Sequence, residues 1–189
     1  MKRNRKLSIA LIAAALALLA TSPSRAQEQD GRWTLEQSTL SYHVSHPVHQ
    51  ADGVSHAAAG QGVCHDGRCD FVITAPVKSF DSGSGLRDRH MQKVTHEEQF
   101  PTITVRTQFP DQPPASPTIY ADLEIQFAGE TAEYKQVAFQ QETQGDEVRI
   151  TGTIPAKVSD FKIKPPSLLT MAIKNEIPVR VEMTWKKEK

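Results

Sequence analysis

From about residue 39 onward, apolar and polar residues alternate one by one in a series of short segments. Alternation of this kind predicts β-strands with one face against an apolar interior and the other face in water. It is the pattern of antiparallel sheets, because buried parallel strands are apolar on both faces. The inner faces are predicted to carry Leu40, Tyr42, Val44, His46, Phe71, Ile73, Ile103, Val105, Thr107, Phe109, Ile119, Ala121, Leu123, Ile125, Phe127, Val137, Phe139, Val148, Ile150, Gly152, Ile154, Ile177, Val179, Val181, Met183 and Trp185.

With a further strand over residues 54–64, the pattern gives eight strands at hairpin spacing. Their apolar faces are buried together either in a sandwich or in a closed barrel, and periodicity alone does not choose between the two. An eight-stranded barrel is wide enough to hold one slender ligand. The single helical pattern covers residues 85–96, where Leu86, His90, Met91 and Val94 recur at spacings of three and four after a candidate cap, Ser84.

The first 26 residues have the organisation of a secretory signal peptide. A basic cluster at residues 2–6 precedes an apolar run over residues 8–20, and Ser24 and Ala26 are small residues at a signal-peptidase site. The run is too short for a membrane anchor, which needs about 20 apolar residues. We therefore expect cleavage after Ala26, export to the periplasm or beyond the cell, no stable membrane anchor, and one domain over residues 27–189.

Removal of this segment changes the charge balance of the chain. Five of the 22 basic residues lie in residues 1–26, which contain no acidic residue, so the remainder carries 17 basic and 22 acidic residues. A mildly acidic domain is a poor partner for nucleic acid. The sequence leaves the oligomeric state open between a monomer and a homodimer.

The two cysteines flank a predicted two-residue turn. Asp66-Gly67 favours a type I′ hairpin, which would place Cys64 opposite Cys69 at a non-hydrogen-bonded pair, within reach of a disulfide. An oxidising compartment would let this structural bond form. The alternative, a redox or metal pair, lacks a Cys-x-x-Cys spacing.

Seven histidines raise the alternative of a metal- or haem-binding redox module. His43 and His49 share a strand face but lie about 20 Å apart at ~3.3 Å per residue, and His46 points to the opposite face. They converge on one ion only if the strand breaks at Pro47. Because the usual zinc and haem spacings are absent, we predict neither a metal nor a cofactor.

Several sequence blocks resemble the YceI-like family. The main block is residues 79–91, SFDSGSGLRDRHM, followed by residues 100–105, FPTITV. The family has a Ser-x-Asp-Thr-Gly-like turn, an Arg-Asp-x-His-Leu helix and a Tyr-Pro-x-Ile-x-Phe strand at these places. Weaker blocks are Tyr42-x-Val44-x-His46, residues 121–129 and residues 159–165, so the resemblance covers nearly all of residues 32–186. It departs from the family at Thr95-His96-Glu97-Glu98, where paired aromatics are usual, and at the disulfide-tipped hairpin.

The resemblance implies a lipocalin-like antiparallel β-barrel in the periplasm that holds a long polyisoprenoid or another amphiphilic lipid, with no catalytic role. The predicted ligand-binding residues are Leu40, Tyr42, Val44, His46, Phe71, Ile73, Arg87, His90, Ile103, Val105, Phe139 and Ile163.

Arg87, Asp88 and His90 have two interpretations. In the first, Arg87 binds a lipid head group and His90, with His46 and Asp88, serves a lipid-modifying enzyme. In the second, Arg87 and Asp88 pair and tie the helix over one barrel end, while His90 bonds a backbone carbonyl. We favour the structural interpretation, because charged groups beside an apolar core are more often satisfied members of a network.

Overall fold

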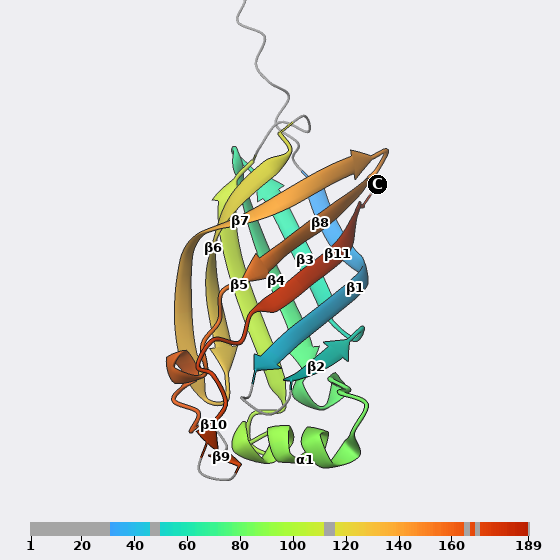
Figure 1. Ribbon diagram of the computed structural model, residues 1–189. Coiled ribbons are helices and arrows are strands. Elements are labelled where there is room, and N and C mark those ends of the chain that lie inside the picture. Colours follow the sequence, from blue (N-terminus) through green and yellow to red (C-terminus); the bar gives the residue numbers. More distant parts are fainter. Residues whose placement is uncertain (1–30, 46–49, 112–115, 165–166, 169–170, 189) are drawn as a thin grey trace, which may run out of the picture.

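A computed structural model describes residues 31–45, 50–111, 116–164, 167–168 and 171–188, and Figure 1 shows the arrangement of the elements. Within these ranges strands dominate, with one α-helix and two short 3₁₀ helices. The elements are β1 (Gly31–Ser45), β2 (Gln50–Ser55), β3 (Ala59–His65), β4 (Arg68–Pro76), η1 (Val77–Ser79), α1 (Gly85–Val94), β5 (Thr102–Pro110), β6 (Thr118–Phe127), β7 (Glu130–Gln144), β8 (Glu147–Ile154), η2 (Val158–Phe161), β9 (Ser167–Leu168), β10 (Met171–Ala172) and β11 (Val179–Lys187).

Eight antiparallel strands close into a barrel. The sheet order is β11-β8-β7-β6-β5-β4-β3-β1, and β11 pairs with β1 from Trp33↔Lys187 to Tyr42↔Val179, which removes both sheet edges. The ninth strand, β2, pairs with the second half of β1, and its Val54 also forms an isolated bridge with Asp81. The closed barrel confirms the predicted fold and decides against the sandwich.

The strand predicted over residues 54–64 is wrong in one respect, because the chain forms two strands there. β2 ends at Ser55, and β3 begins at Ala59 to pair with the first half of β1. Between them, the Ala57 N–H donates to Ser55 Oγ and the Ala58 N–H donates to Ser38 Oγ. The N–H groups of Ala57 and Ala58 are thus bonded by side-chain oxygens instead of by a neighbouring strand. The chain therefore crosses from one part of β1 to the next without leaving these backbone donors unpaired.

The two ends of the barrel differ in construction. The hairpin end carries the β3–β4 turn at Asp66-Gly67, and the helix end carries α1, η1 and η2, with β9 and β10 nearby (Figure 1). Asp66 and Gly67 both have positive φ, 51° and 76°, as the predicted type I′ turn requires.

The helix is two residues shorter than predicted and ends at Val94. The Thr95 N–H and hydroxyl both bond the Met91 carbonyl, and His96 then adopts a positive φ of 53°, which ends the helix. Ser84 occupies the N-cap position but makes no side-chain capping bond. The second 3₁₀ helix, η2, ends at Phe161 and is followed by Lys162, which has a positive φ of 51°.

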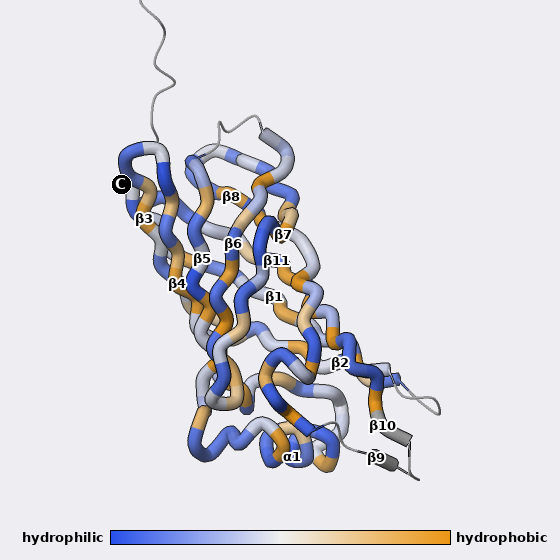
Figure 2. The backbone as a smooth tube through the Cα atoms, turned by 90° about the vertical axis from the view of Figure 1, so that its left-hand side faces the viewer, coloured by the Kyte–Doolittle hydropathy of each residue, from blue (hydrophilic) through white to orange (hydrophobic). Residues whose placement is uncertain are grey.

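Figure 2 shows the hydropathy alternating along the strands. The buried apolar side chains pack into one core cluster. The predicted inner residues supply most of the buried core, including Leu40, Ile73, Leu123, Phe139 and Val181. None of the helices in the described ranges has the length and apolar character needed to cross a bilayer.

Candidate ligand-binding cavity

The barrel encloses a cavity of about 770 Å³. This volume lies within the ~300–1,000 Å³ that small-molecule sites usually occupy. Its wall is overwhelmingly aliphatic and aromatic, supplied by the inward-facing side chains of all eight barrel strands. The alternation that folds the chain is therefore also what makes the interior apolar.

Eleven of the twelve residues predicted to bind a ligand line this cavity, and His46 lies outside the described residues. Nine come from the strands and loops of the barrel, and two come from α1. Their contact with a ligand stays a prediction. The residues on the wall are Leu40, Tyr42, Val44, Phe71, Ile73, Arg87, His90, Ile103, Val105, Phe139 and Ile163.

A disulfide and an aromatic cluster close the hairpin end. Cys64 and Cys69 are bonded across the β3–β4 pair, which confirms the predicted bridge, and they are only 4% and 2% exposed. Beneath them, the Phe71 ring stacks on Phe109 with centroids 5.5 Å apart and meets the edge of Trp185 at 4.7 Å. Aromatic pairs at these distances add stability beyond the area they bury.

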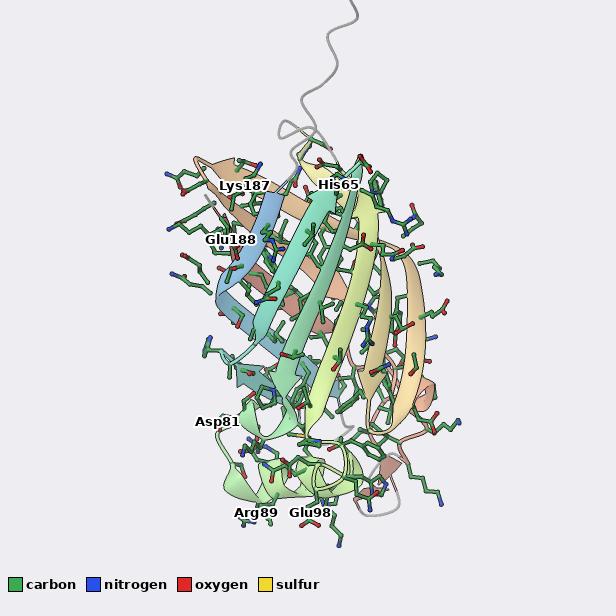
Figure 3. The ribbon with its side chains drawn as sticks, turned by 180° about the vertical axis from the view of Figure 1, so that it is seen from behind. His65, Asp81, Arg89, Glu98, Lys187 and Glu188 are labelled. Atoms are coloured by element: carbon green, nitrogen blue, oxygen red, sulfur yellow. A yellow bond between two sulfur atoms is a disulfide. The ribbon has the colours of Figure 1, made fainter. Side chains whose placement is uncertain are left out.

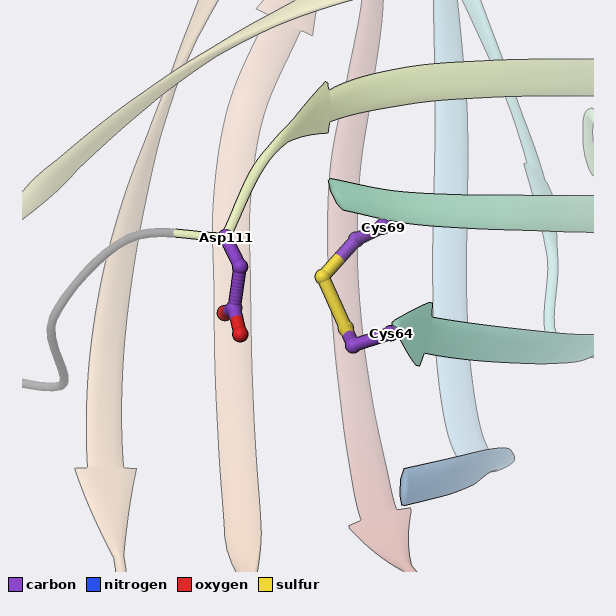
Figure 4. Close-up of side chains that lie close together, drawn as sticks. All are labelled: Cys64, Cys69 and Asp111. Atoms are coloured by element: carbon purple, nitrogen blue, oxygen red, sulfur yellow. A yellow bond between two sulfur atoms is a disulfide. The ribbon is translucent and has the colours of Figure 1, made fainter. Parts of the chain in front are cut away.

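Asp111 lies beside the disulfide (Figure 4), and one of its carboxylate oxygens is within 4.8 Å of both sulfur atoms. Within the described ranges, Cys64, Cys69 and Asp111 form the one group with metal-ligand geometry. The sulfurs are bonded to each other, so they are not the thiolates that a metal requires. The group therefore does not support the metal alternative in its oxidised form.

Helix α1 covers the opposite end of the cavity without being firmly packed there. Leu86, Arg87, His90, Met91 and Val94 line the cavity, yet no α1 side chain is fully buried. Leu86 is 73% exposed. Figure 3 shows Arg89 and Glu98 at this end, far from His65 at the hairpin end.

The first turn of α1 is tied to the preceding loop through Ser82. Asp88 accepts hydrogen bonds from the Ser82 hydroxyl at 2.6 Å and from the Ser82 N–H at 3.1 Å, and Arg87 donates to the Ser82 carbonyl at 2.6 Å. Arg87 and Asp88 thus both tie the helix to Ser82, whereas the structural interpretation expected these two residues to pair with each other. His90 is exposed.

Two tyrosines near the helix end have perturbed acidity. Burial, followed by the negative charge of Asp88, raises the pKa of Tyr42, whose ring packs 5.6 Å from that of Phe80. Burial raises the pKa of Tyr134 further, aided by the hydrogen bond that its hydroxyl donates to Asp160 at 2.6 Å. The hydrogen bond between Tyr134 and Asp160 fixes η2 against β7.

Sequence reasoning missed part of the wall in the first half of β1. Trp33 is buried and lines the cavity, and Leu35 is buried beside it. A β-bulge between Leu35 and Gln37 shifts the register, so the inward positions change from odd to even numbers before Ser38 and Leu40. Alternation at Trp33 and Leu35 was the available signal, but its phase disagrees with that of residues 40–46.

Comparison with solved structures places this architecture among known barrels. Burkholderia cenocepacia BcnA superposes with a TM-score of 0.66 at 15% identity, covering 78% of this chain and 95% of its own. A polyisoprenoid binding domain from Saccharophagus degradans, implicated in plant cell wall breakdown, also gives 0.66 at 15% identity, covering 82% and 98%. The Campylobacter jejuni YCEI protein gives 0.50 at 15% identity, covering 64% and 72%. At these identities the likeness establishes the fold alone.

No curated protein sequence matches the chain significantly. The model of the YceI-like domain, in contrast, matches residues 33–185. The match reaches every strand of the closed barrel and includes α1. These are the regions where the sequence blocks resemble that family. The chain therefore belongs to the YceI-like domain family.

Proposed function

We propose that this protein binds and carries a long-chain polyisoprenoid or a comparable amphiphilic lipid inside the barrel. The observation that carries the proposal is the apolar cavity of about 770 Å³ that runs between the disulfide end and α1. The polyisoprenoid binding domain of Saccharophagus degradans, which shares the fold, supports the same class of ligand.

The energetics of an apolar wall suit such a ligand. Each methylene that leaves water contributes about 0.8 kcal/mol before the costs of binding. Loss of translational and conformational freedom offsets much of this gain. A wall of Leu, Ile, Val and Phe therefore binds by area, and it discriminates only weakly between chains that differ by one methylene.

We further propose that the protein works in the periplasm or outside the cell after cleavage at Ala26. The amino-terminal pattern supports export. The Cys64–Cys69 disulfide is consistent with an oxidising compartment, since such bonds are rare where thiols are kept reduced.

Binding without catalysis is the function that the described side chains favour. Asp88 is engaged with Ser82, and His90 is exposed on α1 rather than held against a second titratable group. General acid–base catalysis needs a positioned group within hydrogen-bond reach of the reacting atom. The cavity wall instead offers apolar area.

A matched pair of valine substitutions tests the proposal. Val105 faces the cavity from β5, whereas Val72 is 44% exposed on the outer face of the neighbouring strand β4. Val105→Asp buries a carboxylate in the wall and is expected to abolish retention of lipid, and Val72→Asp is expected to leave it unchanged. Retention is measured by extracting the purified variants and quantifying lipid by mass spectrometry.

Because Val105→Asp also threatens folding, Val105→Trp provides a second test. The larger apolar ring fills part of the cavity and is expected to reduce lipid retention in a protein that still unfolds cooperatively. Full retention in folded Val105→Trp and Val105→Asp would contradict the assignment of the cavity as the lipid site.

A further inference from the structure

The apolar interior contains two polar atoms that lack a hydrogen-bond partner within the described part of the chain. They are Trp33 Nε1 and Thr107 Oγ1. Both residues are only 8% exposed, and both line the cavity. An unpaired buried donor or hydroxyl is unfavourable, so a native structure normally provides a partner for it.

The two residues belong to one row across the barrel wall, in its hairpin half. Trp33 on β1 lies opposite Gly62 on β3, Gly62 lies opposite Phe71 on β4, and Phe71 lies opposite Thr107 on β5. A Cβ atom at Gly62 would collide with the Phe71 ring, so this ring lies over the glycine between Trp33 and Thr107. Trp33 and Thr107 therefore lie on either side of Gly62 and Phe71 in this row, and Phe71 is itself only partly buried.

Charge at the two ends of the cavity limits what this row can bind. The basic residues on the described wall are Arg87, His90 and Lys157, which belong to the helix end. In the hairpin half, the charged residue on the wall is Asp111, a carboxylate. Lys187 Nζ lies 6.0 Å from the centre of the Trp33 ring, but Lys187 is not part of the cavity wall. A phosphate or carboxylate buried near Thr107 would therefore lack a counter-charge on the wall, which is a large penalty in an apolar site. An uncharged oxygen incurs no such penalty.

We propose that the Thr107 hydroxyl and the Trp33 indole N–H form a subsite for an uncharged oxygen-bearing group of the lipid, such as a carbonyl or hydroxyl. The lipid then lies with this polar group toward the disulfide and its hydrocarbon chain toward α1. Because both protein atoms are covered by their neighbours, the Phe71 ring moves aside as the group binds. The inference rests on the proposed lipid-binding function and adds the chemistry and direction of the ligand.

The isosteric substitution Thr107→Val tests the subsite with two readouts of opposite sign. It removes an unpaired buried hydroxyl, so the lipid-free protein is expected to gain thermal stability. The same change removes a partner of the ligand oxygen, so affinity for a long-chain ketone or alcohol is expected to fall about tenfold. Trp33→Phe, which removes the N–H, is expected to lower that affinity as well.

Controls separate the subsite from general effects on the barrel. Thr104→Val makes the same chemical change on the outer face of β5 and is expected to alter neither readout. The probes are a long-chain ketone, the alcohol of matching length, the corresponding prenyl phosphate and the plain hydrocarbon, each titrated into delipidated protein. The wild type is expected to bind the ketone and alcohol more tightly than the other two, and Thr107→Val is expected to bind the hydrocarbon as the wild type does.

Each other outcome counts against the subsite. Unchanged ketone and alcohol affinity in Thr107→Val, or a loss of stability in the lipid-free variant, would show that the hydroxyl is satisfied without the ligand. Tightest binding of the prenyl phosphate would contradict the uncharged group. If the wild type binds none of the four probes, the proposed function itself fails; if it binds all four equally, only this inference fails.

Discussion

The hairpin end and the helix end of the barrel are closed by different means. At the hairpin end, a disulfide with nearly inaccessible sulfurs lies over the packed rings of Phe71, Phe109 and Trp185. At the helix end, α1 lies over the cavity with no fully buried side chain, and it is tied to its loop mainly by hydrogen bonds to Ser82.

The difference indicates which end opens for a ligand. Segments with few buried apolar contacts and exposed hydrogen bonds open at low free-energy cost, whereas packed and crosslinked segments open only with the whole domain. We therefore expect lipid to enter and leave beneath α1, while the hairpin end stays closed by its disulfide. The predictions below test that asymmetry, beginning with the largest effect.

Truncation of one apolar side chain at each end gives the strongest contrast. Trp185 is 5% exposed and packs edge-on against Phe71, so Trp185→Ala is expected to lower the free energy of unfolding by about 3–5 kcal/mol. Leu86→Ala on α1 is expected to change it by less than ~0.5 kcal/mol. Urea denaturation measures both, and similar losses at the two sites would remove the asymmetry.

Loss of the disulfide is expected to have an intermediate effect. The double variant Cys64→Ala, Cys69→Ala is expected to lose about 2 kcal/mol, because the closed loop is short and constrains the unfolded chain only modestly. The Asp66-Gly67 turn preserves the hairpin. Reduction of the wild type is the matched control and should give a similar loss, while lipid release through the helix end is expected to keep its rate. Faster release from the reduced protein would place the exit at the hairpin instead.

Weakening the tie of α1 is expected to affect exchange more than stability. Asp88→Ala removes two hydrogen bonds from Ser82, which are worth about 1–2 kcal/mol locally, so lipid transfer to acceptor vesicles is expected to accelerate about tenfold. Asp70→Ala, on the exposed face of β4, is the control and should transfer lipid at the wild-type rate. Equal rates in both variants would exclude α1 as the gate.

The smallest effect is a dependence on alkaline pH at the helix end. The pKa of Tyr134 is raised in the folded protein, so the folded state holds this proton when the unfolded state has lost it. Stability is therefore fully present below the unfolded pKa of about 10 and falls as pH rises above it. Tyr134→Phe is expected to make the decline shallower in urea unfolding series between about pH 9 and 11. An identical slope in the two proteins would show that the Tyr134–Asp160 bond does not couple to folding.

Alternation predicted the strands well where their phase was constant and failed where a bulge intervened. Along β6, Ile119 to Phe127 face inward at every second position, as predicted. In β7 the phase changes at Gln136, which has a positive φ of 53°, so Tyr134 and Val137 face the same interior. The position of such a bulge is not predictable from the sequence pattern, because the residues on either side of it keep ordinary strand composition.

The sequence predicted which residues face the cavity, but it did not predict the contacts that these residues make there. Val105, Phe139 and Ile163 line the cavity as their pattern indicated. The contact between Arg87, Asp88 and Ser82 depends on the path of a short loop, and the unpaired hydroxyl of Thr107 depends on what its neighbours offer. Neither property is encoded in local periodicity, since both arise from packing between distant segments.

The most direct test of the account is native mass spectrometry of the wild-type protein purified from the cells that produce it, followed by extraction and identification of any copurified molecule. We predict a mature chain that begins after Ala26, is lighter by two hydrogens for the disulfide, and carries one adduct of several hundred daltons that extracts as a prenyl or acyl lipid. A bare polypeptide that also fails to take up such lipids when they are added would contradict the carrier function.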